Sequence, residues 1–345
     1  MTRIAIEDLA FRYPGAPSDT LSSLQLEIRS GEAHALLGAS GAGKTTLLNL
    51  LSGLLRPSSG RILFDGKDVS NLAPKLRNIA QVFQFPVLYD AMNVANNLAF
   101  PLRNFGFAPS DIESRVARIA DELDLRSALD RKVSGLSLFE KQLVSVGKAL
   151  IRPNVDVVLL DEPLTAVEPH RKWQLRQSLK RVQVDLGVTM IYVTHDQTEA
   201  LTFADRVSVL TVDGILQTAT PEAIYAEPSF EAVGSFVGSP GMDFVNVAGL
   251  SRVPSNLDAS QKLGLRPEWV ELCVPGDGMT AGVCDDIVVL GTAFGERVGI
   301  ATVTTPAGTI NVRTSGDVAL GTQLGIRFKR AAVYRDTALV GSHEF

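Results

Sequence analysis

The sequence predicts an α/β domain followed by a small all-β domain. Over about the first 235 residues, short apolar runs alternate with segments of helical period, which is typical of an α/β domain. Gly, Pro and Ser then recur at residues 234–249. Beyond this stretch the helical periods mostly vanish, and short alternating segments separated by glycines predict a β-barrel or sandwich. We therefore place the domains at residues 1–235 and 236–345.

Individual elements follow from the same patterns. The run at residues 155–160 is continuously β-branched or leucine, as expected of a central parallel strand covered on both faces. Further strands are predicted at residues 33–38, 188–194 and 206–210, and in the second domain at 296–304, 309–313 and 323–327. Helical spacing with mixed charge on one face predicts helices over residues 110–129 and 172–186.

Composition narrows the class of protein. The 345 residues are enough for about two domains. With 33 Lys and Arg against 38 Asp and Glu, the net charge is −5, so the chain lacks the broad basic field of a nucleic-acid-binding protein. Two cysteines are too few for a secreted disulfide framework. The start has no apolar segment typical of a signal peptide, and no apolar run is long enough for a transmembrane helix, so we expect a cytoplasmic protein.

A glycine-rich segment matches the phosphate-binding pattern G-x-x-x-x-G-K-[ST]. Its glycines would let backbone N–H groups surround a β-phosphate, and the next helix would present its positive end to the anion. Lys44 would reach the β- and γ-oxygens, and the Thr45 hydroxyl would bind Mg²⁺. A strand precedes the segment, and an amphipathic helix over residues 45–55 follows, with leucines 47, 50, 51 and 54 as its core stripe. This context favours nucleotide binding over a chance glycine turn. The predicted binding residues are Gly38, Ala39, Ser40, Gly41, Ala42, Gly43, Lys44, Thr45 and Thr46.

Two carboxylates and a histidine follow predicted strands. Asp161, at the end of a buried strand, can hold Mg²⁺ through water, and the next residue, Glu162, can deprotonate a water that attacks the γ-phosphate. The alternative for this pair is an ordinary acidic turn. His195 also ends a strand, where a histidine is commonly structural, but its strand position would place it near the γ-phosphate. The histidines and cysteines show no metal-binding spacing, so no zinc site is predicted.

With these motifs in order, the chain resembles the ATP-binding subunits of ABC transporters over almost its full length. Residues 38–45 resemble Walker A, and residues 159–162 resemble Walker B with its catalytic glutamate. The resemblance implies that Gln84 touches Mg²⁺ and the attacking water, that His195 is the switch histidine, and that Tyr13 stacks on adenine. For Tyr13 a strand-edge core position is the alternative. A helical subdomain at about residues 85–150 and an OB-like (TOBE) regulatory domain at the C-terminus are also implied.

The C-terminal part resembles one branch of these proteins. Residues 220–225 and 236–242 resemble the hinge of carbohydrate-importer ATPases, and residues 264–268 resemble their β-domain. Residues 78–90 resemble bacterial glycerol importers, which carry two different ATPase subunits. The resemblance implies an ATP-hydrolysing subunit on the cytoplasmic face of the bacterial inner membrane. Its partners would be two transmembrane permease subunits, contacted through residues 85–105, a second ATPase subunit and, indirectly, a solute-binding protein.

Other functions stay open beside this one. The chain could be the homodimeric ATPase of another sugar or glycerol-phosphate importer, or a regulatory ATP-binding subunit with weak hydrolysis. A P-loop GTPase or small-molecule kinase is disfavoured because no Asn-Lys-x-Asp motif is present and the β-domain would be unexplained. The acidic charge disfavours an ABC ATPase that acts on DNA or ribosomes.

The ABC signature departs from the family pattern. Residues 136–140 read Leu-Ser-Leu-Phe-Glu instead of Leu-Ser-Gly-Gly-Gln, so Ser137 remains as a hydroxyl donor to a phosphate. Leu138 and Phe139 place side chains where close backbone approach is needed, and Glu140 adds negative charge. The D-loop at residues 165–168 reads Thr-Ala-Val-Glu, where Ser-Ala/Asn-Leu-Asp is usual. These departures favour an asymmetric heterodimer, and the alternative is sequence drift in a working homodimer.

Overall fold

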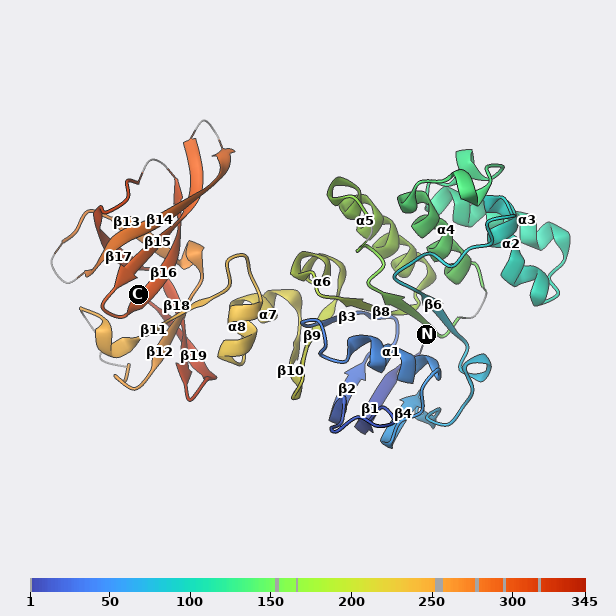
Figure 1. Ribbon diagram of the computed structural model, residues 1–345, viewed down its shortest axis with the longest axis horizontal. Coiled ribbons are helices and arrows are strands. Elements are labelled where there is room, and N and C mark those ends of the chain that lie inside the picture. The colour runs from blue at the N-terminus through green and yellow to red at the C-terminus, as the bar shows by residue number, and fades with distance from the viewer. Residues whose placement is uncertain are drawn as a thin grey trace. The chain divides into compact units, whose positions relative to one another are not determined.

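The computed structural model describes residues 2–152, 155–165, 167–251, 257–276, 279–293, 296–315 and 318–345. The chain divides into two compact units, Met1–Pro221 and Glu222–Phe345 (Figure 1). This division precedes the boundary predicted at residues 235/236. Helix α7 (Pro221–Ala226) therefore starts at the division, and α8 (Glu231–Phe236) belongs to the second unit.

The first unit is built around a six-stranded sheet with the strand order β10-β9-β3-β8-β7-β6. Its strands are parallel except β10, which pairs antiparallel with β9. Every residue of β3, β7 and β8 is buried, which confirms the predicted central strand covered on both faces. The strands are β3 (Ala33–Leu37), β6 (Ile79–Val82), β7 (Val157–Asp161), β8 (Thr189–Thr194), β9 (Arg206–Thr211) and β10 (Gly214–Ala219).

A second, antiparallel sheet in this unit was absent from the sequence prediction. Its order is β2-β1-β4-β5, with β1 (Ile4–Phe11), β2 (Leu21–Ile28), β4 (Ser59–Phe64) and β5 (Lys67–Asp68). Leucines of α1 (Lys44–Ser52) and apolar residues of both sheets share one core. Gly53 adopts the left-handed conformation, with φ of 81°, and ends α1 after Ser52. Leu54 consequently lies outside the helix and is 55% exposed, so its predicted place in the core stripe was wrong.

Three helices form a separate group, the helical subdomain (Figure 1). They are α2 (Val94–Asn104), α3 (Pro109–Glu122) and α4 (Leu138–Leu150). Helix α3 is shorter than the predicted helix, because a 3-10 turn at Arg126–Ala128 replaces its last residues. The remaining helices of the unit are α5 (Pro169–Leu186) and α6 (Gln197–Phe203). Among the residues listed above as described, no helix is both long and apolar enough to cross a membrane.

A histidine lies in the core of the six-stranded sheet. His34, on β3, is fully buried, and its Nδ1 lies 2.6 Å from Glu32 Oε1. Its Nε2 lies 2.8 Å from the Ser208 hydroxyl of β9. Burial lowers the pKa of His34, because the low-dielectric core disfavours the charged imidazolium; Arg206 acts in the same direction, and Glu32 opposes it. The imidazole is therefore neutral near pH 7 and links two strands through hydrogen bonds.

We expect His34 to make the stability of the protein depend on pH. Because its pKa is lowered in the folded state, the unfolded chain binds more protons below the ordinary value of 6.5. The free energy of unfolding should therefore be fully retained above that pH and should decrease as the pH falls below it. Urea unfolding at pH 5 and pH 7.5 measures this difference, which His34→Gln should reduce. The exposed His170→Gln is the control. An unchanged pH dependence in His34→Gln would contradict the assignment.

The second unit is predominantly β, as predicted. One sheet has the order β11-β12-β18-β19 and the other β13-β17-β14-β15-β16. Their strands are β11 (Asp243–Asn246), β12 (Lys262–Leu265), β13 (Val270–Cys273), β14 (Thr280–Ala293), β15 (Glu296–Thr305), β16 (Gly308–Ser315), β17 (Gln323–Phe328), β18 (Arg330–Arg335) and β19 (Ala338–Glu344).

A buried arginine joins the two helices of the second unit to its sheet. Arg266 follows β12, stacks over the Tyr225 ring at 4.2 Å and donates to the Tyr225 carbonyl at 2.8 Å. It also donates to the Gly234 and Val237 carbonyls of α8 and the residue after it. Burial lowers its pKa, and Tyr225 and Glu268 oppose that effect. Because its donors reach backbone carbonyls, the guanidinium keeps hydrogen bonds although it is buried.

Candidate nucleotide-binding site

The glycine-rich loop joins β3 to α1 at the carboxyl edge of the parallel sheet. Gly41 and Gly43 have φ of 87° and 90°, a backbone conformation that glycine adopts without strain. At Gly38 a Cβ atom would lie 2.3 Å from the Leu210 carbonyl oxygen, so a larger residue does not fit. The loop therefore requires glycine at these positions for geometric reasons.

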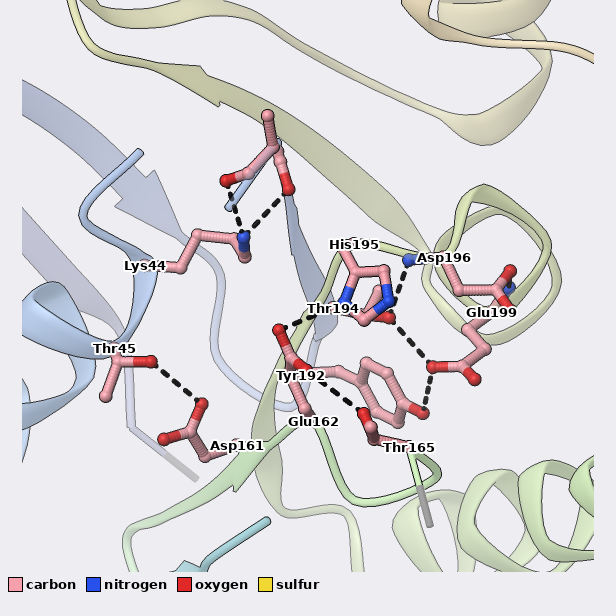
Figure 2. A network of polar contacts seen from close by, with 12 residues as sticks. Lys44, Thr45, Asp161, Glu162, Thr165, Tyr192, Thr194, His195, Asp196 and Glu199 are labelled. Carbon is pink, nitrogen blue, oxygen red and sulfur yellow. Dashed lines mark hydrogen bonds and ion pairs between the residues drawn. The ribbon is translucent and has the colours of Figure 1, made fainter. Parts of the chain in front are cut away.

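Lys44 lies beneath this loop. Its Nζ donates to the Gly38 and Ala39 carbonyls at 2.8 and 2.9 Å (Figure 2). Burial lowers the pKa of Lys44, while Glu162 and Asp161 oppose that shift. The neutral carbonyls give the ammonium hydrogen bonds but no opposite charge. An anionic phosphate bound by the loop would add an opposite charge as a direct partner, beside the more distant effect of Glu162 and Asp161.

Tyr13 lies beside the loop and not within a strand. Strand β1 ends at Phe11, whose ring meets the Tyr13 ring edge-to-face at 4.8 Å. The Tyr13 hydroxyl lies 3.1 Å from Thr46 Oγ1, at the start of α1. With 41% exposure, Tyr13 differs from a core tyrosine. The loop residues Ala39, Ser40 and Gly41 are exposed, whereas Ala42 and Thr46 are buried.

Oxygen atoms that suit Mg²⁺ meet at the same edge. Thr45 Oγ1 donates to Asp161 Oδ1 at 3.3 Å. Burial raises the pKa of Asp161, and the hydrogen bond from Thr45 opposes that shift. Val82 pairs in parallel register with Leu160, so Gln84, two residues further on, also lies at this edge. Hydroxyl, carboxylate and amide oxygens are ligands that Mg²⁺ accepts, so the residues present fit this ion. Among the described residues, this site included, no group of three or more His, Cys, Asp or Glu could hold a metal.

Glu162 faces His195 across the edge of the sheet. Its φ of 44° lies in the left-handed region, which is uncommon for glutamate, and its N–H donates to the Val193 carbonyl of β8 at 3.0 Å. Glu162 Oε1 lies 3.1 Å from His195 Nδ1 (Figure 2). The Glu162 side chain is 19% exposed and the His195 side chain 51% exposed. The structure thus brings together two side chains that are separated by 33 residues.

A buried carboxylate missed by sequence reasoning supports the turn that carries His195. Glu199, on α6, is only 2% exposed and accepts hydrogen bonds from the hydroxyls of Tyr192 and Thr194 at 3.0 and 2.8 Å (Figure 2). Lys172 of α5 pairs with it at 2.9 Å. Burial and the neighbouring Glu199 raise the pKa of Tyr192 well above its ordinary value. The only sequence signal was a glutamate four residues after His195 on an otherwise apolar helix face.

Residues of the signature segment form hydrogen bonds with one another. Ser137 caps α4 and donates its hydroxyl to Glu140 Oε2 at 2.9 Å, and the same oxygen accepts the Ser137 N–H at 2.8 Å. Arg131 pairs with Glu140 Oε1 at 2.6 Å. Although burial would raise the pKa of Glu140, the hydrogen bonds from Ser137 and Arg131 hold it below its ordinary value. The hydroxyl expected to be available for a phosphate is therefore already bonded, and a carboxylate occupies the positive helix end.

The side chains at the two missing glycines also have defined places. Leu138 is 42% exposed, at the first position of α4. The Phe139 ring lies under the Arg171 guanidinium of α5 at 5.0 Å. These side chains stand in the first turn of α4, at the positions where the family pattern has glycines.

The sheet and loop have the arrangement of a P-loop nucleotide-binding protein. Comparison with known proteins identifies the family within this class. Residues 21–165 match the ABC transporter family. The sn-glycerol-3-phosphate import ATP-binding protein UgpC of Chromohalobacter salexigens is 38% identical over 307 residues, covering 88% of this chain and 80% of that protein. UgpC of Paracoccus denitrificans is 38% identical over 307 residues, covering 86% of each chain. The chain therefore belongs to the ATP-binding proteins of ABC transporters, and it is an ATPase.

A solved structure shares the fold of part of this chain. The structure of cbiO1 from Clostridium perfringens, described as part of the ABC transporter complex cbiONQ, superposes with a TM-score of 0.61 and 30% sequence identity. The match covers 65% of this chain and 90% of cbiO1.

Proposed function

We propose that this chain is the energy-coupling ATPase of a bacterial importer for a small polyol. The observation that carries the proposal is the meeting of Lys44, Asp161 and the Glu162–His195 pair at one edge of the sheet. A phosphate binder alone would need only the loop. A carboxylate held beside a histidine suits the activation of a water.

The residues of the site take separate roles in this proposal. The loop from Gly38 to Gly43, with Lys44, Thr45 and Thr46, binds the phosphates of ATP, and Tyr13 stacks on the adenine. Thr45, Gln84 and Asp161 hold Mg²⁺, which neutralises phosphate charge when bound. These assignments rest on the hydrogen bonds and the shared sheet edge described above.

Hydrolysis then needs one base. The water oxygen bonds to the γ-phosphorus while the bond to the β–γ bridging oxygen breaks, so ADP leaves. Glu162 accepts the proton of the water, and Lys44 stabilises charge on the transferred phosphoryl group. His195 and Gln84 are the other two catalytic residues that we propose. His195 contacts Glu162 in the structure, and Gln84 would orient the water.

We place the protein at the cytoplasmic face of the inner membrane, bound to two transmembrane permease subunits that receive substrate from a solute-binding protein. Support comes from apolar side chains after β6: Phe85 is 68% exposed and Val87 60% exposed. Large apolar groups left in water indicate a contact with a partner. Nucleic acid is not a proposed partner.

Glycerol is the proposed substrate, on the resemblance of residues 78–90 to glycerol importers. Glycerol 3-phosphate is the second candidate, because the relatives above are named for its import. Uptake of the two radiolabelled compounds, measured in cells with and without this chain, separates them. Loss of glycerol uptake alone supports the first candidate, and loss of glycerol 3-phosphate uptake alone supports the second.

The hydrogen bonds between residues of the signature support an asymmetric pair of ATPases. Each ATP in such a pair would lie between Walker A of one subunit and the signature of the other. Here Ser137 is held by Glu140, which would repel a phosphate. This chain would thus offer its Walker A and Glu162 to a partner with an ordinary signature, while its own signature serves a weak second site. Native mass spectrometry of the complex purified with ATP should find one copy of this chain beside a different ATPase; two copies would contradict the asymmetry.

Restoring the signature should strengthen that weak site. We expect Leu138→Gly with Phe139→Gly and Glu140→Gln to raise ATP affinity there about tenfold or more, because one hydrogen bond to a charged group is regained. Equilibrium ATP binding and steady-state turnover of the assembled complex measure the effect. Leu138→Ala with Phe139→Ala, which leaves Glu140 in place, is the matched control. Unchanged affinity and turnover in the triple variant would show that this signature does not limit the enzyme.

A further inference from the structure

We propose that Thr165 is a positioning residue for Glu162, and that its hydroxyl decides which carboxylate oxygen accepts the proton of the water. The inference rests on the proposed role of Glu162 as the base. It adds a residue from the D-loop, the segment at residues 165–168 whose sequence departs from the family pattern.

Thr165 makes two hydrogen bonds to Glu162. Its Oγ1 donates to Glu162 Oε2 at 3.0 Å (Figure 2). Its N–H donates to the Glu162 carbonyl at 3.2 Å. Glu162 is also the residue with the left-handed φ of 44°. The strained backbone and the short turn together direct the glutamate side chain back toward the Thr165 hydroxyl.

The two carboxylate oxygens of Glu162 have different partners. Oε2 bonds to Thr165 within the same turn, whereas Oε1 faces His195, which lies after a different strand, β8. Because the contacts use different oxygens, they do not compete. A displacement of the His195 side chain would break the contact at Oε1 and leave the Thr165 contact intact.

This division has a chemical consequence. A hydroxyl hydrogen bond lowers the basicity of the oxygen that accepts it, and it also fixes the orientation of the carboxylate. With Oε2 held by Thr165 within the same turn, Oε1 is the oxygen that takes the proton from water when its contact with His195 opens. His195 would then control access to that oxygen, and Thr165 would keep it correctly aimed.

The test compares variants of the full-length chain in the assembled importer. We expect Thr165→Ala and Thr165→Val to lower kcat for ATP about tenfold, with KM and equilibrium ATP affinity changed less than about twofold. Thr165→Ser, which restores the hydroxyl, should recover most of kcat. Thr202→Ala, at an exposed threonine of α6, is the matched control. Thermal unfolding of each complex verifies that the variants are folded.

Each outcome bears on the proposal. If Glu162→Gln abolishes turnover while Thr165→Ala is as active as the wild type, this inference is overturned and the proposed function stands. If Thr165→Ser is as impaired as Thr165→Ala, the hydroxyl is not what matters, and the inference also fails. If Glu162→Gln itself retains turnover, both the proposed role of Glu162 and the inference built on it are wrong.

Discussion

Glu162→Gln is expected to leave ATP binding intact and to reduce ATP hydrolysis by about a hundredfold or more. The amide has the shape of the carboxylate and can still accept the Thr165 hydrogen bond, but it cannot take a proton from water. Phosphate release by the assembled complex, measured beside equilibrium ATP affinity, separates the two effects. The reduced rate should appear in kcat and not in the dissociation constant.

An exposed glutamate provides the control for this substitution. Glu113→Gln, on α3, makes the same chemical change far from the loop along the chain and should behave as the wild type. Undiminished turnover in Glu162→Gln would remove Glu162 from the mechanism. Loss of ATP affinity in the same variant would indicate a structural role, since a base is not needed for binding.

Lys44→Ala is expected to have the largest effect on ATP binding, a loss of affinity between about tenfold and several-hundredfold. Lys44 is buried beneath the loop, where its Nζ donates to the neutral carbonyls of Gly38 and Ala39, and the carboxylates of Glu162 and Asp161 favour its charged form. A phosphate held by the loop would add a negative charge that can bond directly to this ammonium. Titration with a fluorescent ATP analogue measures the change.

The exposed Lys67→Ala, on β5, removes the same charge from the surface and is the control for Lys44. Its affinity should stay within about twofold of the wild type, because exposed charges are screened by solvent. Retained affinity in Lys44→Ala would show that the backbone N–H groups of the loop are sufficient for binding.

Much of the first unit could be predicted because its signals are local. The buried run that became β7 and the glycine pattern before α1 depend on a few adjacent residues, and their structures follow from burial and backbone geometry. The antiparallel sheet escaped prediction because β1 and β2 mix buried and exposed residues, so they lack the continuous apolar run that marks β7. Leu54 was misplaced because a glycine in the left-handed conformation ended the helix earlier than the leucine spacing indicated.

For the candidate site too, some features could be predicted from the sequence and others appear only in the structure. The sequence by itself determined the phosphate loop, the carboxylates after β7 and the altered signature, since each is a short motif with its own chemistry. Only the tertiary structure decided how these residues are partnered. It placed His195 and Thr165 on opposite oxygens of Glu162. The structure also showed Ser137 bonded to Glu140. The physical reason is that a hydrogen bond depends on distance and direction between side chains, which the order of residues along the chain does not contain.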